Sequence, residues 1–128
     1  MTENQDEGSQ SALVDRLLPA PAEFSSAGNA QGAWSVIAHN GRVTKSWLRL
    51  CENLRENCIR CYQWLQFTPM QPINCRCYAL RHKNYAGVWA YEVGSSERIY
   101  YRPDEDRRRV LVYYAGPHPS KIPYPPED

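Results

Sequence analysis

The sequence predicts an α+β domain of two layers, in which a helical hairpin packs on a mainly antiparallel sheet. Residues 43–68 place apolar side chains at helical spacing in two consecutive stretches, whereas residues 87–119 alternate with the period of two that β-strands require. The helices are grouped together and are not interleaved with strands, which is typical of α+β domains. The predicted order is therefore strand, helix, helix and then four strands.

One strand and two helices are predicted before residue 70. The strand covers residues 33–39 (AWSVIAH) and ends at the turn signal Asn40-Gly41. Residues 43–54 predict the first helix, because apolar side chains recur there at helical spacing. A second helix follows, with Asn57 as its N-cap and Thr68-Pro69 as its end.

Four strands are predicted after residue 70. The first covers residues 75–80 and leads through a basic loop into strands over residues 88–93, 98–102 and 110–115. The segments GSS and PDED supply the turns between the last three strands, because Gly, Ser, Pro and Asp favour turn geometry. In residues 88–93, Trp89, Tyr91 and Val93 face one way and Ala90 and Glu92 the other. In residues 98–102, Ile99 and Tyr101 lie on one face and Arg98, Tyr100 and Arg102 on the other.

Composition divides the 128 residues into three parts. Residues 1–32 are rich in Ser, Ala, Gln, Glu and Pro and predict a mobile N-terminal arm, in which only residues 13–18 could form a turn or two of helix. Residues 33–119 carry the patterned elements and form the predicted domain. Residues 120–128 (SKIPYPPED) predict an extended tail, because proline is too frequent there for helix or sheet.

Charge is distributed unevenly along the chain, whose formal net charge is +1. Residues 1–40 contain one basic and five acidic residues, whereas residues 41–121 contain fourteen basic and seven acidic residues. An excess of seven positive charges on the body is expected of a domain that meets phosphate backbones. A solvated basic surface without such a partner would have the same composition.

We expect a cytoplasmic protein with free thiols. No stretch approaches the roughly 20 apolar residues needed to span a bilayer, and the acidic N-terminus MTENQDEGSQ is unlike a secretory signal. Five cysteines, an odd number, favour free thiols in a reducing compartment. Cys58-x2-Cys61 and Cys75-x-Cys77 could supply four thiolates to a structural zinc, but the first pair falls on an apolar helical stripe and the second lacks knuckle spacing. We favour core thiols and predict no metal site.

Arg98 and His118 are the strongest candidates for chemistry. Arg98 starts one predicted strand and His118 follows the end of the next, and these two ends lie beside each other in an antiparallel pair. The guanidinium and the imidazole are therefore predicted to converge at one end of the sheet. Taken singly, each side chain would more often be structural.

The stretch from residue 87 to residue 119 resembles the RelE/ParE superfamily of bacterial toxins. The resemblance rests on Trp89 before the first hairpin, on the strand motif Arg98-Ile99-x-Tyr101, on a short Asp-containing turn and on a final apolar strand that ends in a His-bearing segment. The order of the elements extends it over residues 33–119. The YoeB-like branch offers the best match, because it also has a His shortly after the last strand.

This resemblance implies a RelE-like fold and the toxin component of a type II toxin–antitoxin pair. RelE-like members cleave messenger RNA, commonly on the ribosome, through attack of a ribose 2′-hydroxyl on the adjacent phosphate. The implied partners are an antitoxin protein, mRNA and the ribosome, without a membrane and without a cofactor. The alternatives are a non-catalytic binding module on the same scaffold, as ParE-like members are toward gyrase, and a small zinc-stabilised interaction protein.

The resemblance also implies roles for individual side chains. Arg98 would hold the phosphate and His118 would act as the general acid. Glu92 would serve as the base, because Tyr78 stands where YoeB-like toxins carry a carboxylate. The basic residues that would steer RNA are Arg81, Lys83 and Arg102.

Overall fold

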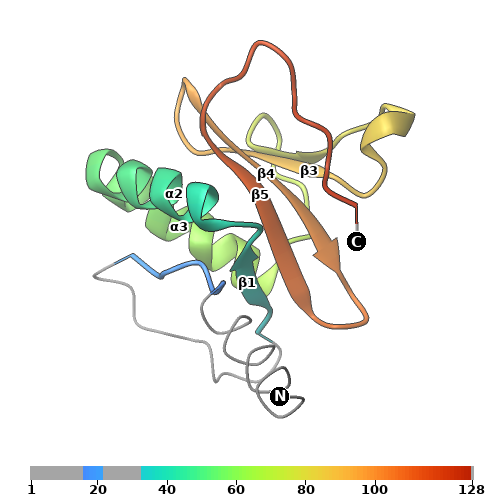
Figure 1. Cartoon of the computed structure of the whole chain (residues 1–128), viewed down its shortest axis with the longest axis horizontal. Coiled ribbons are helices and arrows are strands. Elements are labelled where there is room, and N and C mark those ends of the chain that lie inside the picture. The colour runs from blue at the N-terminus through green and yellow to red at the C-terminus, as the bar shows by residue number, and fades with distance from the viewer. Residues whose placement is uncertain (1–15, 22–32, 128) are drawn as a thin grey trace, which may run out of the picture.

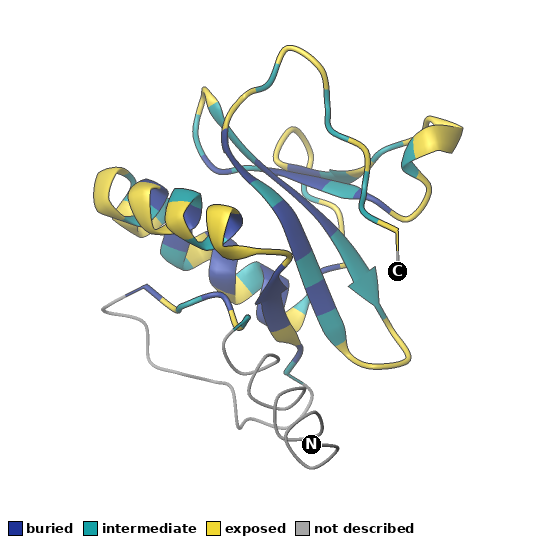
Figure 2. Cartoon of the chain, viewed as in Figure 1, coloured by how far each residue is buried: buried dark blue, intermediate teal, exposed yellow. Residues whose placement is uncertain are grey.

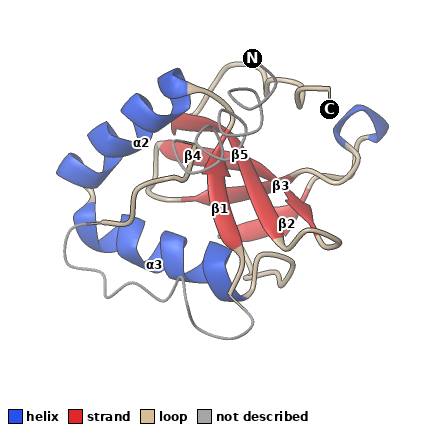
Figure 3. Ribbon diagram, turned by 60° about the horizontal axis from the view of Figure 1, so that its bottom comes forward, coloured by secondary structure: helices blue, strands red, loops and turns tan. Residues whose placement is uncertain are grey.

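The computed structural model describes residues 16–21 and 33–127. The elements are β1 (Ser35–Ala38), α2 (Gly41–Asn53), α3 (Arg55–Phe67), β2 (Cys77–Ala79), the short 3-10 helix η1 (Lys83–Tyr85), β3 (Trp89–Glu92), β4 (Glu97–Asp104) and β5 (Arg109–Pro117). The predicted α+β class is confirmed, because α2 and α3 form a hairpin on one face of a five-stranded sheet (Figures 1 and 3). Within the described ranges, neither helix is long and apolar enough to cross a bilayer.

The sheet has the strand order β1-β5-β4-β3-β2, with β1 parallel to β5 and every other pair antiparallel. The β4–β5 register shifts in the middle of the pair, because Tyr100 lies opposite Tyr114 whereas Tyr101 lies opposite Val112. Tyr113 is therefore the extra residue of a β-bulge. The bulge lets Tyr113 and Tyr114, although consecutive, both pack on the sheet face away from the helices.

The main core lies between the helices and the sheet. Trp47 of α2 and Leu65 of α3 are fully buried there, packed with the side chains that alternation assigned to this face, among them Ile99 and Tyr101. Figure 2 shows the same division, with buried residues inside and exposed residues along the outer sides of both helices. The strand faces predicted from alternation are therefore correct.

Three of the four cysteines considered as zinc ligands are core residues. Cys58, Cys61 and Cys77 have no exposed surface, whereas Cys75 is exposed. Burial raises the pKa of the Cys61 thiol. In the part of the chain that the structure describes, no three His, Cys, Asp or Glu side chains lie close enough together to hold a metal ion.

The predicted cap of the second helix is wrong. α3 starts at Arg55, directly after the single connecting residue Leu54, and Asn57 lies inside its first turn. The Asn57 Nδ2 donates to the Val93 carbonyl at 2.8 Å, so this side chain ties α3 to the end of β3. A side-chain cap is present on the other helix, α2, where the Asn40 side chain accepts from the Val43 N–H at 3.1 Å.

The described part of the N-terminal segment, residues 16–21, packs beside β1. Leu17 forms an antiparallel bridge with Ile37, and the buried Leu18 donates its N–H to the Val36 carbonyl at 2.8 Å. These two leucines are paired as in a strand, so the helical turn considered for residues 13–18 does not include them. The remainder of the predicted arm lies outside the described residues.

The sheet face away from the helices is also covered. Val88, Ala90, Tyr100 and Tyr113 are buried there beneath partly buried residues that include Tyr85 of η1 and Ile122 of the C-terminal segment. Figure 1 shows this segment (red) and η1 on the side of the sheet opposite α2 and α3. The sheet therefore has one face under helices and one face under irregular chain.

Candidate active site

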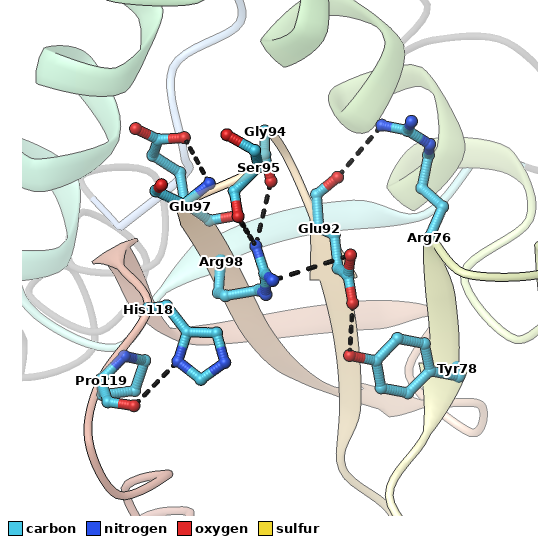
Figure 4. A network of polar contacts seen from close by, with 10 residues as sticks. Arg76, Tyr78, Glu92, Gly94, Ser95, Glu97, Arg98, His118 and Pro119 are labelled. Carbon is cyan, nitrogen blue, oxygen red and sulfur yellow. Dashed lines mark hydrogen bonds and ion pairs between the residues drawn. The ribbon is translucent and has the colours of Figure 1, made fainter.

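Glu92, Arg98 and His118 lie at one end of the sheet, where Figure 4 shows them together with Tyr78. Glu92 on β3 pairs with Arg98 on β4, and Arg98 pairs with Gly116 on β5. His118 follows two residues later, and its main-chain N–H donates to the Ser96 carbonyl at 2.7 Å. This bond anchors the end of β5 to the β3–β4 turn. We call these four side chains, of Tyr78, Glu92, Arg98 and His118, the rim site.

The two terminal nitrogens of the Arg98 guanidinium have different partners, and the side chain as a whole is 11% exposed. Its Nη1 donates to the carbonyl oxygens of Gly94 and Glu97, both at 3.0 Å, and weakly to that of Ser95 at 3.4 Å. These bonds close the β3–β4 turn. The Nη2 faces the Glu92 carboxylate at 3.7 Å, which is an ion pair beyond hydrogen-bond distance. A phosphate oxygen can bind at Nη2 while Nη1 stays bonded to the turn.

Glu92 is held by a neighbour from β2. The Tyr78 hydroxyl donates to the Glu92 Oε2 at 2.8 Å, and the Oε1 is the atom that faces Arg98. Burial, the bond to Glu92 and the negative charge of that carboxylate together raise the pKa of Tyr78 to about 12. Tyr78 therefore stays a neutral donor at physiological pH, and the Glu92 Oε1 is the oxygen available to accept a proton.

His118 is oriented by its own neighbour in the chain. Its Nδ1 lies 2.8 Å from the Pro119 carbonyl oxygen, which can only accept, so Nδ1 carries a proton in this contact. The other ring nitrogen, Nε2, is then an acceptor in the neutral ring and a donor in the imidazolium. The side chain is exposed. It can therefore deliver a proton from Nε2 to a substrate atom at the rim.

The basic residues expected to steer RNA are spread over the molecule. Arg81 is exposed and lines a shallow groove of about 540 Å³ together with Tyr78 and Trp89, so it borders the rim site. Lys83 is exposed on η1. Arg102 lies four residues along β4 from Arg98, or about 13 Å at the usual rise of a strand. Its Nη1 donates to the Pro126 carbonyl at 3.3 Å.

Sequence reasoning missed the aromatic surface next to the rim site. Tyr78, Tyr85, Tyr100, Tyr113 and Tyr114 all pack on the sheet face away from the helices. The rings of Tyr100 and Tyr114 lie 5.6 Å apart across the β4–β5 pair. Alternation alone could have placed Tyr78 and Tyr100 on one face. Tyr113 arrives through the bulge and Tyr85 through η1, neither of which leaves a periodic signal.

Comparisons with known proteins identify the fold. Neither protein-family models nor curated protein sequences match the chain. Among solved structures, a YoeB/ParE toxin from Agrobacterium tumefaciens superposes with a TM-score of 0.50 at 17% sequence identity, covering 65% of this chain and 97% of the toxin chain. Nearly the whole of that toxin thus has a counterpart here. The chain has the fold of the RelE/ParE superfamily of toxins, as its sequence motifs predicted.

Proposed function

We propose that this protein is the toxin of a toxin–antitoxin pair and that it cleaves messenger RNA on the ribosome, in the cytoplasm. The shared fold supports the first part. The observation that carries the second is the grouping of a guanidinium, a carboxylate and an imidazole at one end of the sheet, from Arg98, Glu92 and His118. The excess of positive charge over residues 41–121 suits a polyanionic substrate.

The chemistry is transesterification within the RNA. The ribose 2′-oxygen attacks the adjacent phosphorus and loses its proton to the Glu92 Oε1, while the bond from phosphorus to the 5′-oxygen breaks. His118 gives its Nε2 proton to that 5′-oxygen, so the products are a 2′,3′-cyclic phosphate and a free 5′-hydroxyl. Arg98 binds the non-bridging oxygens through Nη2 and stabilises the charge that gathers there.

The proposed partners follow from the same assignment. A separately encoded antitoxin protein neutralises the toxin, and RNA approaches the rim past the exposed cations Arg81 and Lys83. Because cations that contact phosphates release counterions, RNA binding should weaken steeply as the salt concentration rises. An affinity that does not depend on salt would contradict a phosphate-binding surface.

A binding module without catalytic activity is the second candidate. It is favoured by the contacts that already occupy the rim site, since Nη1 of Arg98 closes a turn and one oxygen of Glu92 accepts from Tyr78. Such a protein would arrest growth through a protein target and leave RNA intact.

Expression in a bacterial host separates the two candidates. We expect growth arrest with cleaved mRNA for the wild-type chain, and loss of both effects for Arg98→Lys and for His118→Gln. His39→Gln and Arg42→Lys serve as matched controls, because both residues are exposed and lie near the start of α2. The controls should arrest growth as the wild type does.

Each outcome has a clear meaning. Growth arrest with intact mRNA supports the binding module and rejects the nuclease. Cleavage that persists in His118→Gln removes this imidazole from the mechanism. A wild-type chain that is harmless without its antitoxin contradicts the toxin assignment itself.

A further inference from the structure

The tail beyond the rim site, residues 120–127 in the described chain, lies along the tyrosine-lined face of the sheet. The Tyr85 hydroxyl donates to the Ile122 carbonyl at 2.7 Å, and the Tyr113 hydroxyl donates to the Pro123 carbonyl at 2.9 Å. The Tyr124 ring stacks on Tyr85 with centroids 5.2 Å apart and planes 24° from parallel. Arg102 reaches Pro126 near the end of the tail, as described above.

These contacts follow one chemical rule, in which the sheet side donates and the tail accepts. Two phenol hydroxyls and one guanidinium supply the protons, and three main-chain carbonyl oxygens receive them. Prolines at 123, 125 and 126 have no N–H, so the tail presents acceptors and few donors. A strand of RNA offers the same groups, namely phosphate and sugar oxygens as acceptors and flat bases for stacking.

The tail lies on the surface of the domain and is at most half-buried. None of its described residues is buried, and the Tyr124 side chain that stacks on Tyr85 is still 52% exposed. The main core between the helices and the sheet includes no residue of the tail. We therefore expect the sheet to stay folded when the tail detaches. His118 precedes the tail and would stay in place, because its main-chain N–H is bonded to the Ser96 carbonyl.

We propose that residues 120–127 are an intramolecular cover of a nucleotide-binding face, and that single-stranded RNA replaces them on Tyr85, Tyr113 and Arg102. This inference rests on the proposed nuclease function and deepens it. RNA whose cleaved phosphate lies at Arg98 would continue along β4 toward Arg102, which is the path that the tail now occupies. The chain binds RNA more weakly with the tail in place than without it, because displacement of the tail uncovers two phenol hydroxyls and one guanidinium.

Removal of the tail tests this cover. A chain that ends at Ser120 keeps His118 and its bond to Ser96 but loses all the tail acceptors. Binding of a fluorescein-labelled single-stranded RNA 12-mer is measured by anisotropy at one fixed salt concentration, with thermal melting as the check on folding. We expect the shortened chain to bind about tenfold more tightly, since RNA no longer has to displace three partly buried hydrogen bonds. Tyr124→Ala, which removes the stacked ring and keeps every tail charge, should give a smaller gain.

Charge needs its own control, because the truncation also removes Lys121, Glu127 and Asp128. The full-length double variant Glu127→Gln/Asp128→Asn neutralises the two carboxylates and keeps the cover, so its affinity should stay within about twofold of the wild type. A tenfold gain in this control would assign the effect to charge and overturn the cover.

The remaining outcomes separate the cover from the nuclease. If the full-length and shortened chains bind RNA equally and cleave ribosome-bound mRNA equally, the cover is wrong and the nuclease stands. If neither chain binds RNA or cleaves ribosome-bound mRNA, both proposals fail. If the shortened chain does not fold, Tyr124→Ala decides, and an affinity equal to that of the wild type overturns the cover.

Discussion

Replacement of Arg98 by lysine separates the structural role of this side chain from its chemical role. The structural role is the closure of the β3–β4 turn by Nη1, and the proposed chemical role is the binding of phosphate by Nη2. A lysine ammonium keeps the charge and has three donors, so it can satisfy the turn carbonyls. It cannot bind the turn carbonyls through one nitrogen and the phosphate through a second, as the planar guanidinium can.

The magnitudes follow from the contacts of Arg98. A hydrogen bond to a charged group contributes about 1.5–3 kcal/mol, and the turn bonds share one nitrogen, so we assign about 2 kcal/mol to the whole set. The ion pair with Glu92 at 3.7 Å adds at most about 1 kcal/mol. We therefore expect Arg98→Ala to lower the free energy of unfolding by about 2–3 kcal/mol, and Arg98→Lys to lower it by less than about 1 kcal/mol.

The rate of RNA cleavage, unlike stability, should fall strongly when lysine replaces Arg98. Loss of a donor aimed at the charge of a transition state costs about 10²–10³ in rate. Arg98→Lys should therefore stay folded and reduce single-turnover cleavage of ribosome-bound mRNA at least 100-fold. Urea unfolding and single-turnover cleavage are measured on the same samples. Cleavage within about threefold of the wild type would show that the guanidinium does not hold the phosphate. Equal destabilisation by Lys and Ala would refute the account of the turn.

Three further predictions concern pH, packing and thiol reactivity. The pKa of Tyr78 in the folded protein, about 12, exceeds the ordinary value of 10. The stability that Tyr78 contributes is therefore complete below pH 10 and is lost between pH 10 and 12. The urea midpoint of Tyr78→Phe should fall less over that window than the midpoint of the wild type. Tyr101→Phe leaves the buried Pro69 carbonyl without its donor at 2.7 Å and should cost about 1–3 kcal/mol in urea unfolding, whereas a cost near zero would mean that water replaces the hydroxyl. Ellman's reagent should label exposed Cys75 first, half-buried Cys51 more slowly and the buried Cys58, Cys61 and Cys77 only in denaturant, and Cys75→Ser should remove the fastest phase.

The elements and faces of the domain are readable from the sequence because each strand has one side under the helices. Burial of Tyr91, Ile99 and Tyr101 on that side enforces a period of two, and the same period sends Glu92 and Arg98 to the other face. Their meeting with His118 follows from antiparallel pairing and short turns. The same reasoning failed at Asn57, since a cap and a helix-interior residue that binds a distant carbonyl look identical in a sequence.

The segments that cover the second face of the sheet could not be predicted, because their contacts are non-local and aperiodic. A single inserted residue in β5 brings Tyr113 beside Tyr114, and a proline-rich segment that composition describes only as extended lies over them. Composition nevertheless contains the chemical reason for that placement, since prolines remove donors from the tail and tyrosines put donors on the sheet. The rim site thus depends on strand register, whereas access to the surface beside it depends on a segment held by three partly buried hydrogen bonds. A change in the tail should therefore alter RNA affinity without moving Arg98, Glu92 or His118.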